Sequence, residues 1–221
     1  MVMDYAAAYE RTRTKPYAET FRCPGGELCL DFCNTGQAAR DTRQEEWLSD
    51  YGELAAWLQA TGALSAKQAN AVRDGAESAP EAAQRVWSRA LRLREALTRV
   101  LIAKAQRRAP FTDDLHLIEH EYARSARNAR LAPAEDGFRW TVDGEARDPD
   151  VALRPLVESA VSLMTSPRMA RLRRCGNATC YWLFLDETKN ASRRWCEMAS
   201  CGNLMKVRRH RARARRATKP G

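Results

Sequence analysis

The sequence predicts an α+β fold that is mostly helical, with a helical N-terminal domain, a few short antiparallel strands and a small C-terminal module built on four cysteines. Three observations predict it. Apolar residues recur at helical spacing through much of residues 49–166, turn-forming residues bound the few strand-like runs, and four of the seven cysteines lie in two matched pairs after residue 174. With 221 residues and 44% hydrophobic side chains, the chain can bury a core, and disordered and collagen-like classes are excluded.

The first elements follow from turn and capping residues. Residues 1–20 are polar and aperiodic, which predicts a flexible arm. The run 27–35 is short and apolar and follows a Gly-Gly pair, so we expect a buried strand there. Ser49 or Asp50 can cap a helix that ends near Gly62, and Ser65 opens a second helix.

The later elements complete an N-terminal domain expected over residues 21–167. The longest helix is expected within 80–110, because Pro suits the first turn and apolar side chains then recur at i, i+3 and i+4. A further helix is predicted over 112–130. Residues 137–144 alternate and end in Asp-Gly, which predicts a small hairpin, and 149–166 return to helical spacing before a hinge at Pro167.

Charge is distributed unevenly along the chain. Residues 168–221 carry 15 Lys plus Arg against three acidic residues, a net of +12, whereas residues 1–167 carry 22 basic and 25 acidic residues, a net of −3. This contrast predicts a basic module that binds a polyanion. No apolar run approaches the ~18 residues of a membrane span, and no cleavable signal is recognisable, so we expect a cytoplasmic protein without a membrane partner.

Two pairs of cysteines predict a metal site in this module. Cys175 and Cys180 are separated by four residues, Cys196 and Cys201 likewise, and 15 residues lie between the pairs. Two such pairs can close a tetrahedron of thiolates around one structural Zn²⁺, with no open position for a catalytic water. Two disulfides or four buried thiols are the alternative, which a cytoplasmic setting disfavours. We expect a β-hairpin followed by a basic helix, as in a treble clef, that unfolds on chelation.

The segment after the last cysteine is the candidate nucleic-acid interface. On a helix, Val207, His210 and Ala214 share one narrow face, and seven basic side chains occupy most of the remaining arc. Such a helix repels itself until phosphates neutralise it, so ordering on binding is expected; a solvated tail is the alternative. The candidate contacts are Arg193, Arg194, Lys206, Arg208, Arg209, Arg211, Arg213, Arg215 and Arg216.

Several runs resemble a known family. Residues 174–180, 184–186, 193–196 and 201–211 resemble the CGNR-type zinc finger of bacterial proteins, and residues 28–35 and 50–58 are similar to the ABATE domain that precedes that finger. The resemblance implies a stress-responsive transcriptional regulator that binds DNA through its finger and has no known enzymatic step. It also implies that the four paired cysteines are zinc ligands. Leu204 stands where the family has its eponymous arginine.

Other polar and cysteine residues near the N-terminus have less specific signals. Asp31, Asn34 and Thr35 end the run 27–35, where they can hydrogen-bond a small-molecule effector or cap the chain locally. The remaining cysteines, Cys23, Cys29 and Cys33, could form a second metal or redox site, but we expect them to pack as small apolar residues.

The leading hypothesis is a zinc-dependent regulator whose basic module binds duplex DNA while residues 21–167 sense an effector or mediate assembly; a homodimer is left open. An RNA- or ribosome-associated protein needs the same charges, with Tyr181, Trp182 and Trp195 as stacking candidates. A metallohydrolase is the third hypothesis, because His116, Glu119 and His120 match the H-x-x-E-H pattern. No other histidine lies nearby to complete that site, so a non-enzyme is preferred.

Overall fold

Helix boundaries in the computed structural model follow the capping residues of the sequence. The structure describes residues 22–36, 46–127, 129–142 and 147–217. Its helices there are α3 (Leu28–Asn34), α4 (Tyr51–Ala60), α5 (Ala66–Ser78), α6 (Pro80–Ala105), α7 (Thr112–Ala126), α8 (Arg154–Thr165) and α9 (Asn203–Ala217). The single turns are η2 (Pro149–Leu153), η3 (Pro167–Arg171) and η4 (Met198–Gly202). The strands are β1 (Ala129–Ala134), β2 (Gly137–Val142), β3 (Leu172–Arg174) and β4 (Leu183–Leu185), paired antiparallel as β1–β2 and β3–β4. The mostly helical α+β class is confirmed.

The predicted caps of α4 and α5 are confirmed. The Asp50 carboxylate accepts the Glu53 backbone N–H at 2.8 Å, and Gly62, just past the end of α4, has a φ of +76°. Ser65 and Gln68 form a reciprocal capping box at the start of α5. These local bonds satisfy backbone donors that the first turn of a helix leaves free.

The strand predicted over residues 27–35 is wrong, because the segment forms α3. Six of its seven residues are buried, from Cys29 to Asn34, and the helix packs against α8, α6 and β4. A short helix covered on every side has no polar stripe, so its sequence cannot be distinguished from a buried strand by periodicity. Cys29 and Cys33 are buried as expected, whereas Cys23 is exposed, contrary to the prediction.

The first hairpin exists but lies earlier than predicted. Helix α7 ends at Ala126, and the following residues form β1 instead of continuing the helix. Strands β1 and β2 pair from Ala129–Val142 to Ala134–Gly137, so the turn is at Glu135 and Asp136. The Asp-Gly pair chosen from the sequence, at positions 143–144, lies outside the described residues.

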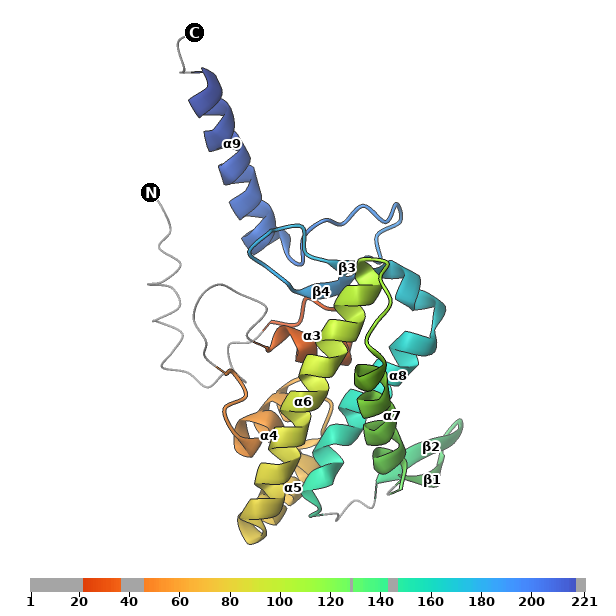
Figure 1. Ribbon diagram of the computed structural model, residues 1–221. Coiled ribbons are helices and arrows are strands. Elements are labelled where there is room, and N and C mark those ends of the chain that lie inside the picture. Colours follow the sequence, from red (N-terminus) through yellow and green to blue (C-terminus); the bar gives the residue numbers. More distant parts are fainter. Residues whose placement is uncertain (1–21, 37–45, 128, 143–146, 218–221) are drawn as a thin grey trace.

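The core lies around α6, the long helix that crosses the molecule (Figure 1). Its buried face, which includes Leu93, Leu97 and Leu101, packs against α4, α5 and α7. The core then continues past Pro167, because Leu172, Leu183 and Leu185 of the β3–β4 hairpin belong to the same buried cluster. The two charge-defined parts of the sequence therefore share one core. No helix among the described residues has the length and apolarity to cross a membrane.

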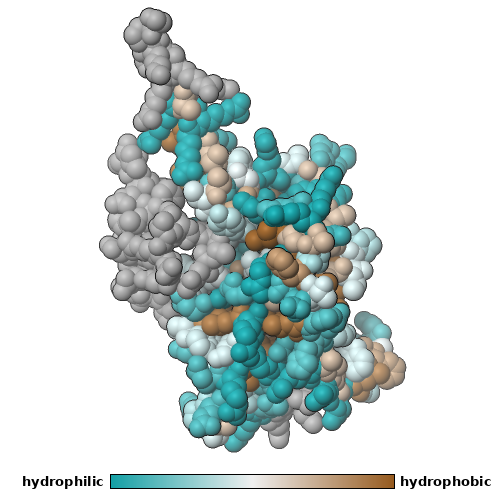
Figure 2. Space-filling view, viewed as in Figure 1, coloured by the Kyte–Doolittle hydropathy of each residue, from teal (hydrophilic) through white to brown (hydrophobic). Residues whose placement is uncertain are grey.

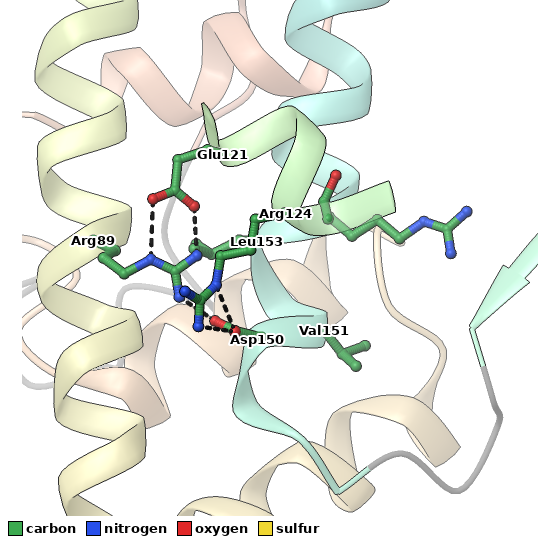
Figure 3. Close-up of a pocket in the computed structure, with 8 residues that line it drawn as sticks. Arg89, Glu121, Arg124, Asp150, Val151 and Leu153 are labelled. Carbon is green, nitrogen blue, oxygen red and sulfur yellow. Dashed lines mark hydrogen bonds and ion pairs between the residues drawn. The ribbon is translucent and has the colours of Figure 1, made fainter. Parts of the chain in front are cut away.

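A network of ion pairs ties α6, α7 and η2 together beside this core (Figure 3). Arg89 pairs with both Glu121 and Asp150, and Arg124 reaches Asp150 at 2.7 Å. These four charged groups line a small pocket and are bonded to one another across the three elements. We interpret it as a structural joint between helices and not as a ligand site.

Candidate metal centre

Four cysteine side chains converge at the base of α9. Cys175 follows β3, Cys180 precedes β4, Cys196 ends the next loop and Cys201 lies in η4. Their sulfur atoms all lie within 4.8 Å of one another, and all four residues are buried. Among the described residues, only this group offers three or more His, Cys, Asp or Glu ligand atoms close enough together to hold a metal ion.

The spacing of the sulfur atoms fits zinc and not a disulfide. The Sγ atoms of Cys180 and Cys196 are 3.8 Å apart. A tetrahedron with Zn–S bonds of ~2.3 Å has edges of about 3.8 Å, whereas a disulfide bond is ~2.05 Å long. All seven cysteines are free. The donor set therefore fits one zinc ion held by four thiolates, which supplies folding energy and leaves no site for a bound water.

Backbone hydrogen bonds shape the loops that present the sulfur atoms. The Cys175 N–H donates to Trp182 O at 2.9 Å, and the Gly176 N–H donates to Arg194 O at 2.8 Å. A Cβ at position 176 would lie 3.0 Å from that same carbonyl oxygen and 3.0 Å from the Trp195 ring, so glycine permits the close approach. Trp182, Phe184 and Trp195 pack around the cluster and exclude water from it.

Hydrogen bonds to sulfur favour the thiolate form of two ligands. Bonds from the Cys180 and Cys196 thiols lower the pKa of Cys175 to about 6. Bonds from the neighbouring thiols, Cys175 first, and from the Asn177 amide also lower the pKa of Cys201. The same shared hydrogen bonds, that to Cys175 first, raise the pKa of Cys180 and Cys196, so zinc has to displace the protons of these two thiols when it binds.

Two residues that the sequence reasoning did not assign support the ligands. Asn177 is buried, and its amide nitrogen lies 3.5 Å from the Cys201 sulfur, while its oxygen accepts the Thr179 N–H at 3.3 Å. Asp186 is fully buried, and its carboxylate accepts the Thr188 hydroxyl at 2.5 Å and the Arg193 N–H at 2.9 Å. The bond from Thr188 is the main reason that the pKa of Asp186 is lowered. Outer-shell polar groups of this kind orient metal ligands.

The structure places Arg193, one of the candidate DNA contacts, partly inside the fold. Its guanidinium donates to the backbone carbonyls of four residues and lies 4.3 Å from the centroid of the Phe184 ring. These carbonyls belong to Pro24, Leu185, Trp195 and Cys196. Four of its five N–H groups are therefore used inside the fold. Arg193 holds the N-terminal segment against the metal centre, which leaves one N–H group of its guanidinium for a contact with DNA.

The basic helix α9 begins directly after the last ligand. Figure 1 shows it projecting away from the body, with hydrophilic side chains at this end in Figure 2. Lys206, Arg208, Arg209 and Arg211 are exposed, and Arg194 is exposed beside the metal centre. Three further candidates, Arg213, Arg215 and Arg216, lie on the same helix. Leu204, at the position of the family arginine, is half-buried in the first turn.

Comparison with protein-family models matches nearly all of the described chain. The ABATE model, described as "Putative stress-induced transcription regulator", matches residues 26–167, and the CGNR zinc finger model matches residues 171–214. The chain belongs to the ABATE family. A search among curated proteins finds no match. The cysteine cluster lies within the segment that matches the CGNR finger, so the family evidence and the sulfur geometry both identify a zinc-binding protein.

The three candidate effector residues of the ABATE domain have partners within the protein. The Asp31 carboxylate accepts the Gly25 N–H at 2.8 Å, and its burial raises its pKa to about 6. The Asn34 side chain donates to Leu183 O at 2.9 Å and accepts the Leu183 N–H at 2.8 Å. The Thr35 hydroxyl donates to a backbone carbonyl of α3 at 2.6 Å. All three side chains are buried, and Asn34 joins the ABATE domain to the finger.

The residues behind the two rival hypotheses are also placed. His116, Glu119 and His120 are exposed on α7. Within the described residues, no further ligand lies close enough to the two histidines to complete a metal site. Of the proposed stacking aromatics, Trp182 is buried and Trp195 packs on the metal centre. Tyr181 is exposed, with Arg174 4.7 Å above its ring. The structure thus gives little support to either rival.

Proposed function

We propose that this ABATE protein is a zinc-dependent transcriptional regulator that binds duplex DNA through α9. Residues 168–221 form the DNA-binding module in this proposal, and residues 21–167 sense an effector or mediate assembly. The observation that carries it is the position of α9, which starts at a buried zinc ligand and extends outward with exposed basic side chains. A metal centre at one end of a basic helix fixes where that helix meets the phosphates.

The distribution of charge supports a polyanion as the partner. The last 18 residues carry eight basic side chains and no acidic one. In the ABATE domain, by contrast, arginines such as Arg89, Arg94 and Arg154 are bound to carboxylates. On the finger, Arg194, Arg209 and Arg211 are exposed. Arginine presents a planar fork of donors that suits phosphates and guanine edges.

Contacts between the ABATE domain and the finger provide a route for a signal. Leu183 and Leu185 of β4 lie in the main core, while Phe184 between them packs on the metal centre. Asn34 adds two hydrogen bonds from α3 to the backbone of Leu183. A change in the position of α3 would therefore move β4, the strand between the ligands Cys180 and Cys196. This supports an N-terminal domain that controls the finger.

The test is DNA binding as a function of salt. If about six phosphates are neutralised, log affinity falls against log salt with a slope of about −5. Arg208→Ala should reduce the steepness by about one and weaken binding to all sequences, whereas Arg85→Ala, an exposed arginine on α6 far along the chain from the finger, should leave both unchanged. Fluorescence anisotropy with labelled duplexes measures both quantities, and a flat salt response would refute the proposal.

Competition distinguishes DNA from RNA. Unlabelled single-stranded RNA added at fixed salt should displace the duplex only at much higher concentration, because a single exposed aromatic, Tyr181, is available for base stacking among the three candidates. Displacement at lower RNA than DNA concentration would replace duplex DNA by RNA as the partner. Selection from a random duplex pool, with and without chelator, would then establish sequence preference and its metal dependence.

A further inference from the structure

The β1–β2 hairpin carries an exposed apolar face. Cross-strand pairing places Leu131 opposite Trp140 and Pro133 opposite Phe138, and these four side chains share one face because alternate residues of a strand point the same way. Leu131 is 57% exposed, Phe138 73% and Trp140 66%. The hairpin stands away from the helices, and hydrophobic residues gather at that end of the molecule (Figures 1 and 2). We call this set the hairpin face.

An uncovered hairpin of this kind is poorly stable by itself. Two-stranded antiparallel ribbons are marginal in water unless further strands or another surface cover them. The described anchor is one hydrogen bond from Arg154 Nη1 to Thr141 O at 2.8 Å, on α8 and β2 respectively. The apolar side chains of the hairpin face are covered only in part by the described residues, with Leu131, Phe138 and Trp140 each more than half exposed.

The area of the hairpin face matches the apolar part of a dimer interface. An aromatic side chain offers ~150–250 Å² for burial, so the exposed parts of Leu131, Phe138 and Trp140 together give roughly 400 Å². A standard interface covers ~800 Å² on each partner, of which ~65% is apolar in homodimers. One hairpin face thus supplies most of the apolar surface that one subunit of a stable dimer needs.

The surface beside the hairpin face has charges of both signs, which suits a second copy of the same surface. Trp140 also forms one wall of a groove of about 470 Å³. The same groove is lined by the exposed Lys67 of α5 and by Glu158 of α8, whose half-exposed side chain also pairs with Arg154. In a two-fold arrangement the lysine of each copy can meet the glutamate of the other. An apolar centre with a polar rim is the usual anatomy of an interface.

We propose that the hairpin face is a dimerisation surface, on which two copies of this chain pack face to face across a two-fold axis. The occupant is a second copy because the surface is self-complementary: apolar against apolar at the centre, Lys67 against Glu158 at the rim. The hairpin lies at the end of the molecule opposite α9 (Figure 1). The dimer would therefore carry its two basic helices at far ends, and dimerisation does not depend on DNA binding.

The experiment is sedimentation equilibrium of the full zinc-loaded chain without DNA, from about 2 to about 200 μM. The expected mass rises from 25.0 kDa toward twice that value, with a dissociation constant in the range of about 1–50 μM. Phe138→Asp should raise this constant at least about a hundredfold, because a charge then faces its own copy in an apolar centre. Trp140→Ala should raise it about tenfold or more.

The chain offers a matched control. Phe111 is also 73% exposed, but it precedes α7, whose 15 residues extend ~22 Å toward the hairpin. Phe111→Asp should leave the dissociation constant within about twofold of wild type. Hydrogen exchange supplies a test without any variant, because the amides of residues 137–142 should exchange more slowly at high protein concentration. A mass of 25.0 kDa at every concentration, or equal effects of the two aspartate variants, would overturn the proposal.

Discussion

Loss of zinc should destabilise the ABATE domain as well as the finger, because one face of the β3–β4 hairpin packs in the main core and the other packs on the metal centre. Phe184 packs on the metal centre, whereas Leu172, Leu183 and Leu185 are almost completely buried in the main core. The perturbation is Cys196→Ser or a strong zinc chelator. Either removes a contribution of ~10–16 kcal/mol, which is enough to release the hairpin.

The cost to the main core follows from those three leucines. Complete burial of a leucine side chain is worth about 2 kcal/mol, so exposure of all three costs about 6 kcal/mol as an upper figure. For a chain of this size, 1 kcal/mol shifts the midpoint of thermal unfolding by about 2–4 °C. We therefore expect the midpoint of thermal unfolding of α6 and the helices packed against it to be about 12–24 °C lower without zinc.

Far-ultraviolet circular dichroism measures this directly, since the helical signal comes mostly from residues before the finger. Cys23→Ser is the matched control, because Cys23 is exposed and is not one of the four clustered cysteines. The control should melt like wild type. If chelated protein retained the wild-type midpoint for its helical signal, the hairpin could not be part of the main core in the way described.

Three further predictions concern single residues. Burial raises the pKa of Asp31 to about 6 from an ordinary value of 3.8, so the folded protein favours the protonated carboxyl group. Ionisation of Asp31 therefore lowers the free energy of unfolding; this loss is absent below pH ~4 and complete above pH ~6. Asp31→Asn should raise the free energy of unfolding at pH 7.5 by up to about 3 kcal/mol and flatten its decline from pH 4 to 6 in urea titrations; a loss of stability would show that the charge is needed. Gly75→Ala, which helix propensity alone favours by about 1 kcal/mol, should instead destabilise α5, because its Cβ would lie 1.7 Å from Arg147 O; thermal melting above wild type would contradict this. Arg193→Lys should weaken zinc affinity about 10–100-fold in competition with a colorimetric chelator, since an ammonium cannot serve four carbonyls and stack on Phe184; unchanged affinity would assign the clamp no role.

Local signals predicted the helices and the metal centre well. Capping residues such as Asp50 and Ser65 bond to the first turn of their own helix, so the sequence nearby predicts where that helix begins. The spacing of the four paired cysteines is itself typical of a structural metal site. The segment 27–35 was misassigned because burial on all sides erased the amphipathic pattern that distinguishes a helix from a strand. Only its neighbours α6, α8 and β4 determine what it becomes.

The position of the first hairpin and the environment of Arg193 also depend on the surrounding structure. The chain has two Asp-Gly pairs near the first hairpin, and the turn uses the one at Asp136–Gly137. Sequence cannot choose between them, because the choice depends on which residues pair across the strands. Arg193 looks like its neighbour Arg194 in the sequence, yet it points inward to carbonyl groups while Arg194 is exposed. An arginine next to a metal ligand can bond to carbonyl groups inside the protein or remain exposed for a binding partner. The position of the surrounding backbone determines which of the two occurs.

If α9 binds duplex DNA as proposed, its length limits how many base pairs one chain can contact. Fifteen residues span ~22 Å, which corresponds to about six base pairs of duplex at 3.4 Å each. A given six-base-pair sequence recurs by chance about once in 4,000 positions, whereas genomes present ~10⁶ or more competing positions. A single copy would thus find matching sequences at hundreds of sites. Specific binding to a few promoters would require two such sequences at a fixed separation.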